Sequence, residues 1–337
     1  MASVSPSTIP GMAAGAARLR VPLADTSYAW PALIATVLLV ITTEIVDPRF
    51  LAGSNLSPVV VVLAPFVLIS MAQALPLISG HGGLDLSVGP MAGIVTVLVA
   101  AILEPAHVTS IPMVLVIILG SGVLVGAVNG ALIAYLRIPP VIVTLGSYLV
   151  LSGLAVQILP SPGGTVPSWL SGLAGIAGGV PLMLVPIAVV VVLWVWLKST
   201  EFWRNLRVVG GDERCAFTAG VNVALLRVGI YIVAGLLAAV AGIALAASLG
   251  SGDSTVGPNY SLISFAGAAL GGVSLSGGRG GMLGAAAGGC ILFLVQNLLT
   301  LANVSVFQQQ IAEGLLLVFA LVANSLGVKL RLRRRED

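Results

Sequence analysis

Amide and hydroxyl side chains stand at isolated positions within long apolar stretches of this sequence. They are Gln73, Asn129, Thr144, Ser147, Gln157, Gln296 and Asn297. These groups exchange hydrogen bonds without a fixed charge, which suits contact with a neutral polyhydroxy solute. Each of these side chains can equally form a hydrogen bond between helices, and such a bond contributes about 0.6–2 kcal/mol in a membrane. As a set they are candidates for a substrate path, headed by Asn129 and the Gln296–Asn297 pair.

Residues for catalysis or energy supply are missing from the sequence. Lys198-Ser199 resembles the end of the phosphate-binding motif G-x-x-x-x-G-K-[ST], but Leu197 occupies the position of the required glycine. His81 and His107 are isolated, so the chain has no H-E-x-x-H motif and no histidine-based metal cluster. We therefore predict no enzyme activity, no metal and no cofactor on this chain, and no partnership with nucleic acid.

The composition requires a membrane around the elements that carry these residues. Hydrophobic residues make up 58% of the 337 and charged residues 8%, against about a quarter in soluble domains. A soluble fold could not cover so much apolar surface, whereas lipid can serve as the outer solvent. The sequence predicts an all-α, polytopic integral membrane protein with about ten transmembrane helices. The predicted spans are 29–46, 58–79, 86–103, 111–136, 140–159, 181–197, 227–248, 259–275, 282–302 and 309–327.

The distribution of Lys and Arg predicts the orientation of these spans. With the N-terminus inside, only Arg49 of the 15 basic residues lies outside, as the positive-inside rule favours. Both termini are then cytoplasmic. Residues 1–28 are expected to form a disordered tail, 29–327 a transmembrane domain with an inner loop at 198–226, and 328–337 a basic tail. The inner loop is long enough for a short helical hairpin.

Two glycine-rich runs join predicted spans. The first, Gly82-Gly83-Leu84-Asp85-Leu86-Ser87-Val88-Gly89, precedes the third span, and the second, Gly271-Gly272-Val273-Ser274-Leu275-Ser276-Gly277-Gly278, ends the eighth. Glycine permits tight turns between helices, and Asp85 can cap the helix that follows it. The shared pattern also hints at an internal repeat, which is common among transporters.

These runs resemble the signature of permease subunits of ribose-type ABC sugar importers. The resemblance continues through Leu270–Gly280 and the inner-loop residues 210–223, and it covers roughly residues 45–325. The family-motif positions are Gly83, Asp85, Leu86, Ser87, Gly89, Gly271, Gly272, Ser276, Gly277, Gly278, Arg279 and Gly280. The resemblance implies a type II ABC importer-like permease of the bacterial cytoplasmic (inner) membrane.

The same resemblance implies partners. A cytoplasmic ABC ATPase subunit would bind the ATP, an extracytoplasmic sugar-binding protein would deliver the solute, and a second permease copy or sister permease would complete the path among membrane lipid. In the family an inner-loop helix docks on the ATPase. The matching residues here are Gly210, Gly211, Asp212, Glu213, Gly220 and Asn222, although the two alanines that usually follow the glutamate are replaced by Arg214 and Cys215.

Other functions stay open at this stage. Two acids that many sugar permeases carry before the second run are replaced here by Ser261 and Ile263, and His81 and Pro76 stand where small or hydroxyl residues are usual. The cargo could instead be a branched amino acid, a nucleoside or an autoinducer-like sugar. A stand-alone secondary carrier is disfavoured, because Glu313 is the only charged residue inside a predicted span apart from Glu44 and Arg227 at span ends, and carriers usually hold several.

Overall fold

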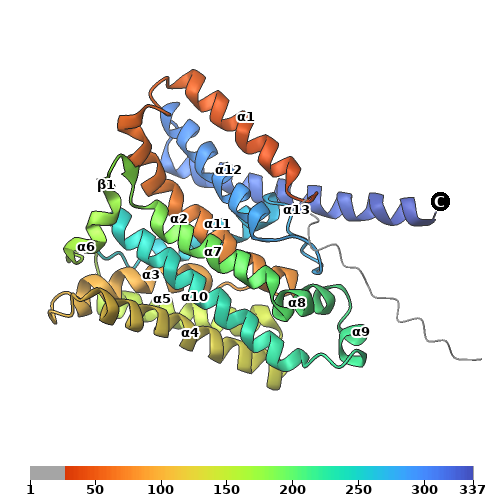
Figure 1. The fold of residues 1–337 in the computed structure, drawn as a ribbon. Helices are drawn as coiled ribbons and strands as arrows, with labels where there is room; N and C mark the ends of the chain where they lie inside the picture. The colour runs from red at the N-terminus through yellow and green to blue at the C-terminus, as the bar shows by residue number, and fades with distance from the viewer. Residues whose placement is uncertain (1–26, 337) are drawn as a thin grey trace, which may run out of the picture.

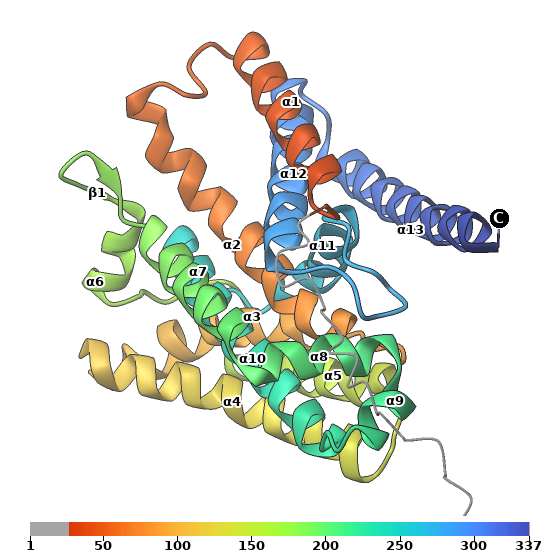
Figure 2. The ribbon, with the colours of Figure 1, turned by 45° about the vertical axis from the view of Figure 1, so that its right-hand side comes forward.

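The structure, a computed structural model, describes residues 27–336 and the side chains of residues 27–322. Its long helices pack lengthwise into a bundle in which α2 and α10 are central (Figures 1 and 2). They are α1 (Trp30–Val46), α2 (Gly53–Ile78), α3 (Val88–Val97) with a π-helical extension (Leu98–Leu103), α4 (Ile111–Tyr135), α5 (Pro140–Ile158), α7 (Leu184–Ser199), α10 (Val223–Leu249), α11 (Val256–Leu270), α12 (Met282–Leu301) and α13 (Val306–Glu336). Each predicted span overlaps one of them. The predicted N-terminal tail lies outside the described residues, except for Ser27 and Tyr28.

Five of the described helices, α2, α4, α5, α10 and α12, are long and apolar enough to cross a membrane. A sixth span results if α7 is counted together with α8 (Glu201–Gly211), which follows it after a bend of 76°. Shorter apolar helical stretches are α1, α3 with its π-helical extension, and Val306–Val322 of α13. α11 has 15 residues, which at 1.5 Å per residue is shorter than the ~30 Å hydrocarbon core. The structure thus shows a polytopic helical protein with five to six span candidates.

The two long loops contain short elements of their own. The outer loop holds α6 (Ser168–Ser171), a 3-10 turn (Gly172–Ala174) and two antiparallel strands, β1 (Ile176–Ala177) and β2 (Val180–Pro181). The strictly all-α prediction is therefore wrong at this hairpin. Gly178 and Gly179 both have positive φ, which a two-residue hairpin turn requires. The inner loop holds α8 and α9 (Glu213–Thr218), which fits the predicted helical hairpin.

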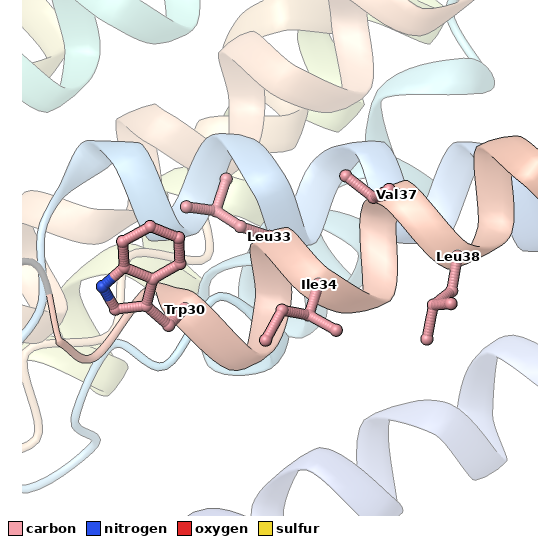
Figure 3. Close-up of a pocket in the computed structure, with 5 residues that line it drawn as sticks. All are labelled: Trp30, Leu33, Ile34, Val37 and Leu38. Atoms are coloured by element: carbon pink, nitrogen blue, oxygen red, sulfur yellow. The ribbon is translucent and has the colours of Figure 1, made fainter.

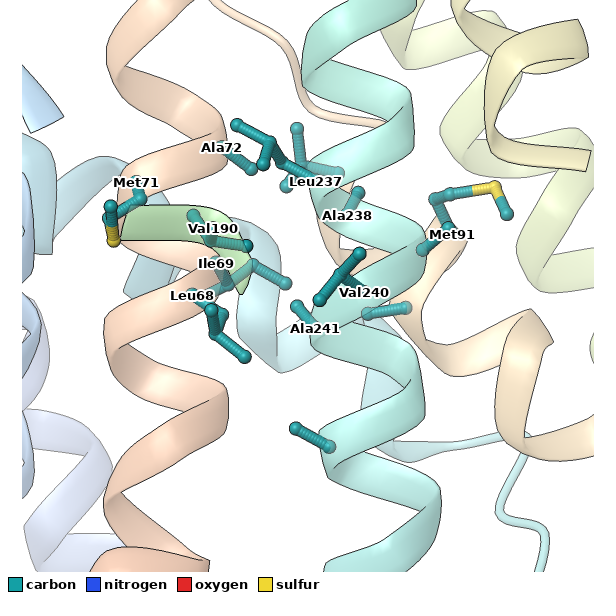
Figure 4. Packing of buried hydrophobic residues seen from close by; sticks show 14 of the residues in the cluster. Leu68, Ile69, Met71, Ala72, Met91, Val190, Leu237, Ala238, Val240 and Ala241 are labelled. Carbon is teal, nitrogen blue, oxygen red and sulfur yellow. The ribbon is translucent and has the colours of Figure 1, made fainter. Parts of the chain in front are cut away.

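Small and branched side chains bring α2 and α10 together at the core. Leu68, Ile69 and Ala72 of α2 meet Leu237 and Ala241 of α10 (Figure 4). Most of both helices is buried inside this single chain, whereas only 22% of the most apolar stretch of α4 and of α5 is buried. α2 contains Pro58, Pro65 and Pro76, which membrane helices tolerate because neighbouring helices satisfy the freed carbonyls. The rigid centre of the protein is thus built from its second and tenth helices.

Glycines at intervals of four residues let α4 approach α10 closely. An added methyl group at Gly126 would lie 2.2 Å from the carbonyl oxygen of Tyr231, and one at Gly122 would lie 2.5 Å from that of Gly235. Gly130 meets Val228 in the same way. Without a strong hydrophobic drive between helices in lipid, such close backbone packing supplies the attraction. This seam fixes α4, which carries Asn129, against the core.

The loops between the helices contact one another at two opposite faces of the bundle. At the face predicted to be outer, Gly163 and Gly252 exchange backbone hydrogen bonds and the indole of Trp169 donates to the carbonyl of Thr109. At the other face lie the segments 79–87, 198–226 and 271–281. α13 leaves the bundle in both views (Figures 1 and 2), and its helix continues through the basic segment 328–336, which was predicted as a separate tail.

Candidate functional site

The first glycine-rich run forms an irregular segment, residues 79–87, between α2 and α3. Asp85 is 2% exposed, and its carboxylate accepts hydrogen bonds from the backbone N–H and the hydroxyl of Ser87 at 2.9 and 2.6 Å. The predicted helix cap is therefore misplaced, because Ser87 itself is the N-cap residue of α3 and no side chain caps it. Instead, Asp85 locks the turn before the helix. A buried carboxylate is tolerated only when it is hydrogen-bonded in this way.

Four of the predicted path residues converge on this segment. Asn129 of α4 donates to the Ser87 hydroxyl at 3.0 Å and accepts from the Ser147 hydroxyl of α5. Thr144 of α5 donates to the carbonyl of Leu84 at 3.2 Å. The Gln73 amide of α2 faces the backbone of Asp85, and it pairs with both groups when its oxygen accepts from the N–H and its nitrogen donates to the carbonyl.

This buried network is held from a further side by α11, where the Ser261 hydroxyl donates to the carbonyl of Leu86 at 2.8 Å. Gln73, Asn129 and Thr144 are fully buried. In this conformation their hydrogen bonds fix the glycine-rich run to four helices, as the interhelical alternative predicts. Contact with substrate stays a prediction for these residues.

The other three predicted path residues lie elsewhere. Gln157 is exposed on α5, and Gln296 is half-buried on α12. The neighbouring Asn297 has a buried side-chain oxygen without a hydrogen-bond partner among the described residues. None of the three joins the Asp85 network. Their placement on a path is likewise a prediction that this structure of a single chain leaves open to test.

The second glycine-rich run forms a compact loop between α11 and α12. Its glycines at 272, 277, 278 and 280 have positive φ, which other residues adopt at a cost. The backbone N–H of Ser274 donates to the carbonyl of Arg279 at 3.1 Å and closes the loop, while Arg279 and Ser276 are exposed. Gly271 packs against the backbone of Gly284. The motif therefore specifies a backbone shape, and its one basic side chain points to solvent.

The predicted coupling loop contacts α10 and the residue just before the first run. The Glu213 carboxylate binds the Arg227 guanidinium, which is 19% exposed, and lies 3.3 Å from Nε2 of His81. Glu213 thus faces its own chain, and docking of its carboxylate on an ATPase stays a prediction. Sequence reasoning missed this triad because its members are 132 and 14 residues apart. The one available signal was the unusual histidine at position 81.

The N-terminal ends of α9 and α10 are fixed by the side chains of their N-cap residues, Asp212 and Asn222. The Asp212 carboxylate accepts from the backbone N–H groups of Cys215 and Arg214, which hold the pKa of Asp212 below its usual range. Asn222 caps α10 by accepting from the N–H of Leu225, and Gly220 turns the chain between the two helices with φ +83°. Phe217, 73% exposed, projects from α9. An exposed aromatic side chain on an ordered helix is suited to binding by a partner protein.

The groove in Figure 3 has the wrong chemistry for a polyhydroxy solute. It runs along α1 and is lined by Trp30, Leu33, Ile34, Val37 and Leu38. All polar surface is absent from its lining, so it offers no hydrogen bonds to a sugar. An apolar face of this kind suits lipid or another helix.

Comparisons with known proteins agree with the resemblance in the motifs. Residues 55–322 match the family described as the permease component of the branched-chain amino acid transport system. The ribose import permease protein RbsC of Bacillus subtilis is 35% identical over 85% of this chain and 89% of its own length. The galactose/methyl galactoside import permease protein MglC of Salmonella typhimurium is 32% identical over 87% and 93%.

A third relative, the probable ABC transporter permease protein YphD of Escherichia coli, is 33% identical over 87% of this chain and 88% of its own length. No solved structure matches the chain. The matched region contains both glycine-rich runs, the Asp85 network and the loop with Glu213. The chain therefore belongs to the family of ABC importer permease components that includes the ribose and galactose import permeases.

Proposed function

We propose that this chain is the permease subunit through which a monosaccharide or related polyol enters a bacterial cell. The observation that carries this proposal is the similarity to ribose and galactose import permeases over nearly the whole chain. Uncharged amides and hydroxyls in the helices fit such a solute, because they can replace the hydrogen bonds that it makes with water. The subunit has no phosphate-binding loop in its sequence, so the energy must come from a partner.

The proposed assembly contains two permease subunits, either two copies or two sister chains, in the cytoplasmic membrane. A cytoplasmic ABC ATPase docks on α8 and α9, and an extracytoplasmic binding protein delivers the sugar to the opposite face. Ten spans with both termini inside complete this arrangement. Support comes from the correspondence of every predicted span with a helix and from the gathering of the predicted inner segments at one face. ATPase closure would open the path alternately to the two sides.

Transport by the reconstituted importer tests the proposal. The chain would be co-expressed with its partner ATPase and binding protein, placed in proteoliposomes, and supplied with labelled ribose, galactose or leucine. We expect uptake of a sugar that needs ATP, the ATPase and the binding protein together. Uptake of leucine but of neither sugar would show that the cargo is an amino acid. Sugar uptake by the chain without ATPase would identify a secondary carrier and overturn the proposal.

A further inference from the structure

Three segments far apart in the sequence contact one another through backbone atoms at the face predicted to be inner. They are the end of α2 with Gly80, the end of α8 with Gly210, and the loop before α12 with Gly277 and Gly278. The backbone N–H of Gly278 donates to the carbonyl of Ile78 at 2.8 Å. No side chain lies between the three segments. A displacement of one segment therefore cannot be taken up by side-chain rotamer changes and must move the backbone of the others.

The contact is too close for any other residue. A methyl group added at Gly210 would lie 1.8 Å from the carbonyl oxygen of Ile78 and 2.6 Å from the nitrogen of Gly278. One added at Gly277 would lie 2.4 Å from the Cα of Gly80 and 2.6 Å from the carbonyl oxygen of Gly210. Every obstructing atom is backbone, which has no flexible end to move aside. The neighbouring Gly211 differs, because a methyl group there would meet nothing within 4 Å.

Each segment leads directly to a part of the candidate site. Asp212 and α9 follow Gly210 after a single residue, and Glu213 at the start of α9 binds Arg227 and His81. Five residues after Gly80 comes Asp85 with its buried network. Gly277 and Gly278 lie in the loop that joins α11 to α12. The contact therefore stands between the element proposed to meet the ATPase and both glycine-rich runs.

We propose that Gly80, Gly210 and Gly277 form a mechanical joint that passes the movement of α9 to both glycine-rich runs at once. Gly210 is a positioning residue in this joint and contacts neither ATP nor solute. The inference rests on the proposed function, in which an ATPase moves α9. It adds the route of that movement and explains why glycine stands at positions 210 and 277. The contacts of Glu213 with Arg227 and His81 keep α9 in register with the joint.

The ratio of sugar imported to ATP hydrolysed tests the joint in the complete importer. Gly210→Ala should lower this ratio at least tenfold while the complex still assembles and hydrolyses ATP, because α9 moves without carrying the two runs. Gly153→Ala, on α5 and outside the coupling loop, is the matched comparison and should lose far less, since a methyl group there would meet nothing within 4 Å. Equal ratios for the two variants would overturn the joint. No uptake by the unaltered complex would instead contradict the proposed function.

Hydrogen exchange in the unaltered complex gives a second measurement that does not depend on a variant folding. ATP binding should change the exchange of residues 78–82, 208–218 and 275–281 together, because a backbone joint links them. Residues 150–158 of α5, beyond the Ser147 contact, serve as an internal reference away from the joint. A change confined to 208–218, with 275–281 unaffected by ATP, would show that α9 moves independently and would contradict the inference.

Discussion

At the scale of single residues, Asn129 is the centre of the buried network around the first glycine-rich run. Its amide joins the hydroxyls of Ser87 and Ser147, which come from different helices. Asn129→Ala would leave the buried Ser87 hydroxyl and the half-buried Ser147 hydroxyl without this partner, so we expect a loss of about 1–3 kcal/mol in the free energy of unfolding in detergent. Gln157→Ala on the exposed face of α5 should change the same quantity by less than about 0.5 kcal/mol.

A double-mutant cycle between Asn129→Ala and Ser147→Ala isolates their hydrogen bond. Buried pairs in membrane proteins couple by about 0.6 kcal/mol on average, and we expect at least that value here. Additive effects of the two changes would show that the network contributes no coupling. Such additivity would return both residues to the candidates for a water-lined path, because solvent would then satisfy the amide in place of the protein.

The residues of this site could be found from the sequence more easily than their partners. A polar side chain within an apolar run is conspicuous, and four of the seven residues chosen on that basis meet at Asp85. Which helix face each one occupies depends on helix rotation, and rotation is set by packing rather than by local pattern. The pairs Glu213–His81 and Gln73–Asp85 depend on such packing, so the local sequence could not predict them, although the unusual histidine at position 81 was one signal.

At the scale of elements, the glycine seam sets the distance between α4 and α10. Gly126→Ala would push a methyl group to 2.2 Å from the Tyr231 carbonyl, and overpacking of this kind costs about 1–3 kcal/mol. We expect a lower melting temperature and a weakened Asn129 network, because Asn129 follows Gly126 by one turn on α4. Gly120→Ala on the same helix meets nothing within 4 Å. A melting temperature as low as that of Gly126→Ala would show that helix propensity, not the seam, controls stability.

The exposed tip of α9 carries the prediction for ATPase docking. Phe217 is 73% exposed on an element that Asp212 caps and Glu213 anchors, so the side chain is presented in a fixed position. Aromatic anchors of this kind often dominate an interface. Phe217→Ala should weaken binding of the ATPase at least tenfold in a detergent-solubilised pull-down titration. Phe307→Ala, equally exposed but on α13, is the control and should leave this affinity unchanged.

The elements themselves were predictable because hydrophobic runs and basic loops follow simple physical rules. Lipid selects apolar segments of sufficient length, and each predicted span overlaps a helix of the structure. The boundaries were harder, as α10 begins four residues before its predicted span and α11 ends five residues before its predicted end. In both cases local features decide: the Asn222 cap begins α10, and the glycines from 271 onward release the chain from α11.

At the scale of the whole molecule, chemical labelling of the exposed Cys215 can show which face of the bundle lies inside the cell. Cys215 is exposed on α9, at the face that gathers the predicted inner segments, whereas Cys290 is partly buried within α12. A membrane-impermeant maleimide should therefore leave intact cells unlabelled and modify Cys215 only after the membrane is opened. Ser168→Cys, placed on α6 in the opposite loop, should react in intact cells. Since α6 and α9 lie at opposite ends of the bundle, this pair of results determines the orientation of every helix between them. Labelling of Cys215 in intact cells would invert the topology, place α9 outside the reach of a cytoplasmic ATPase and remove the basis for coupling through the glycine joint.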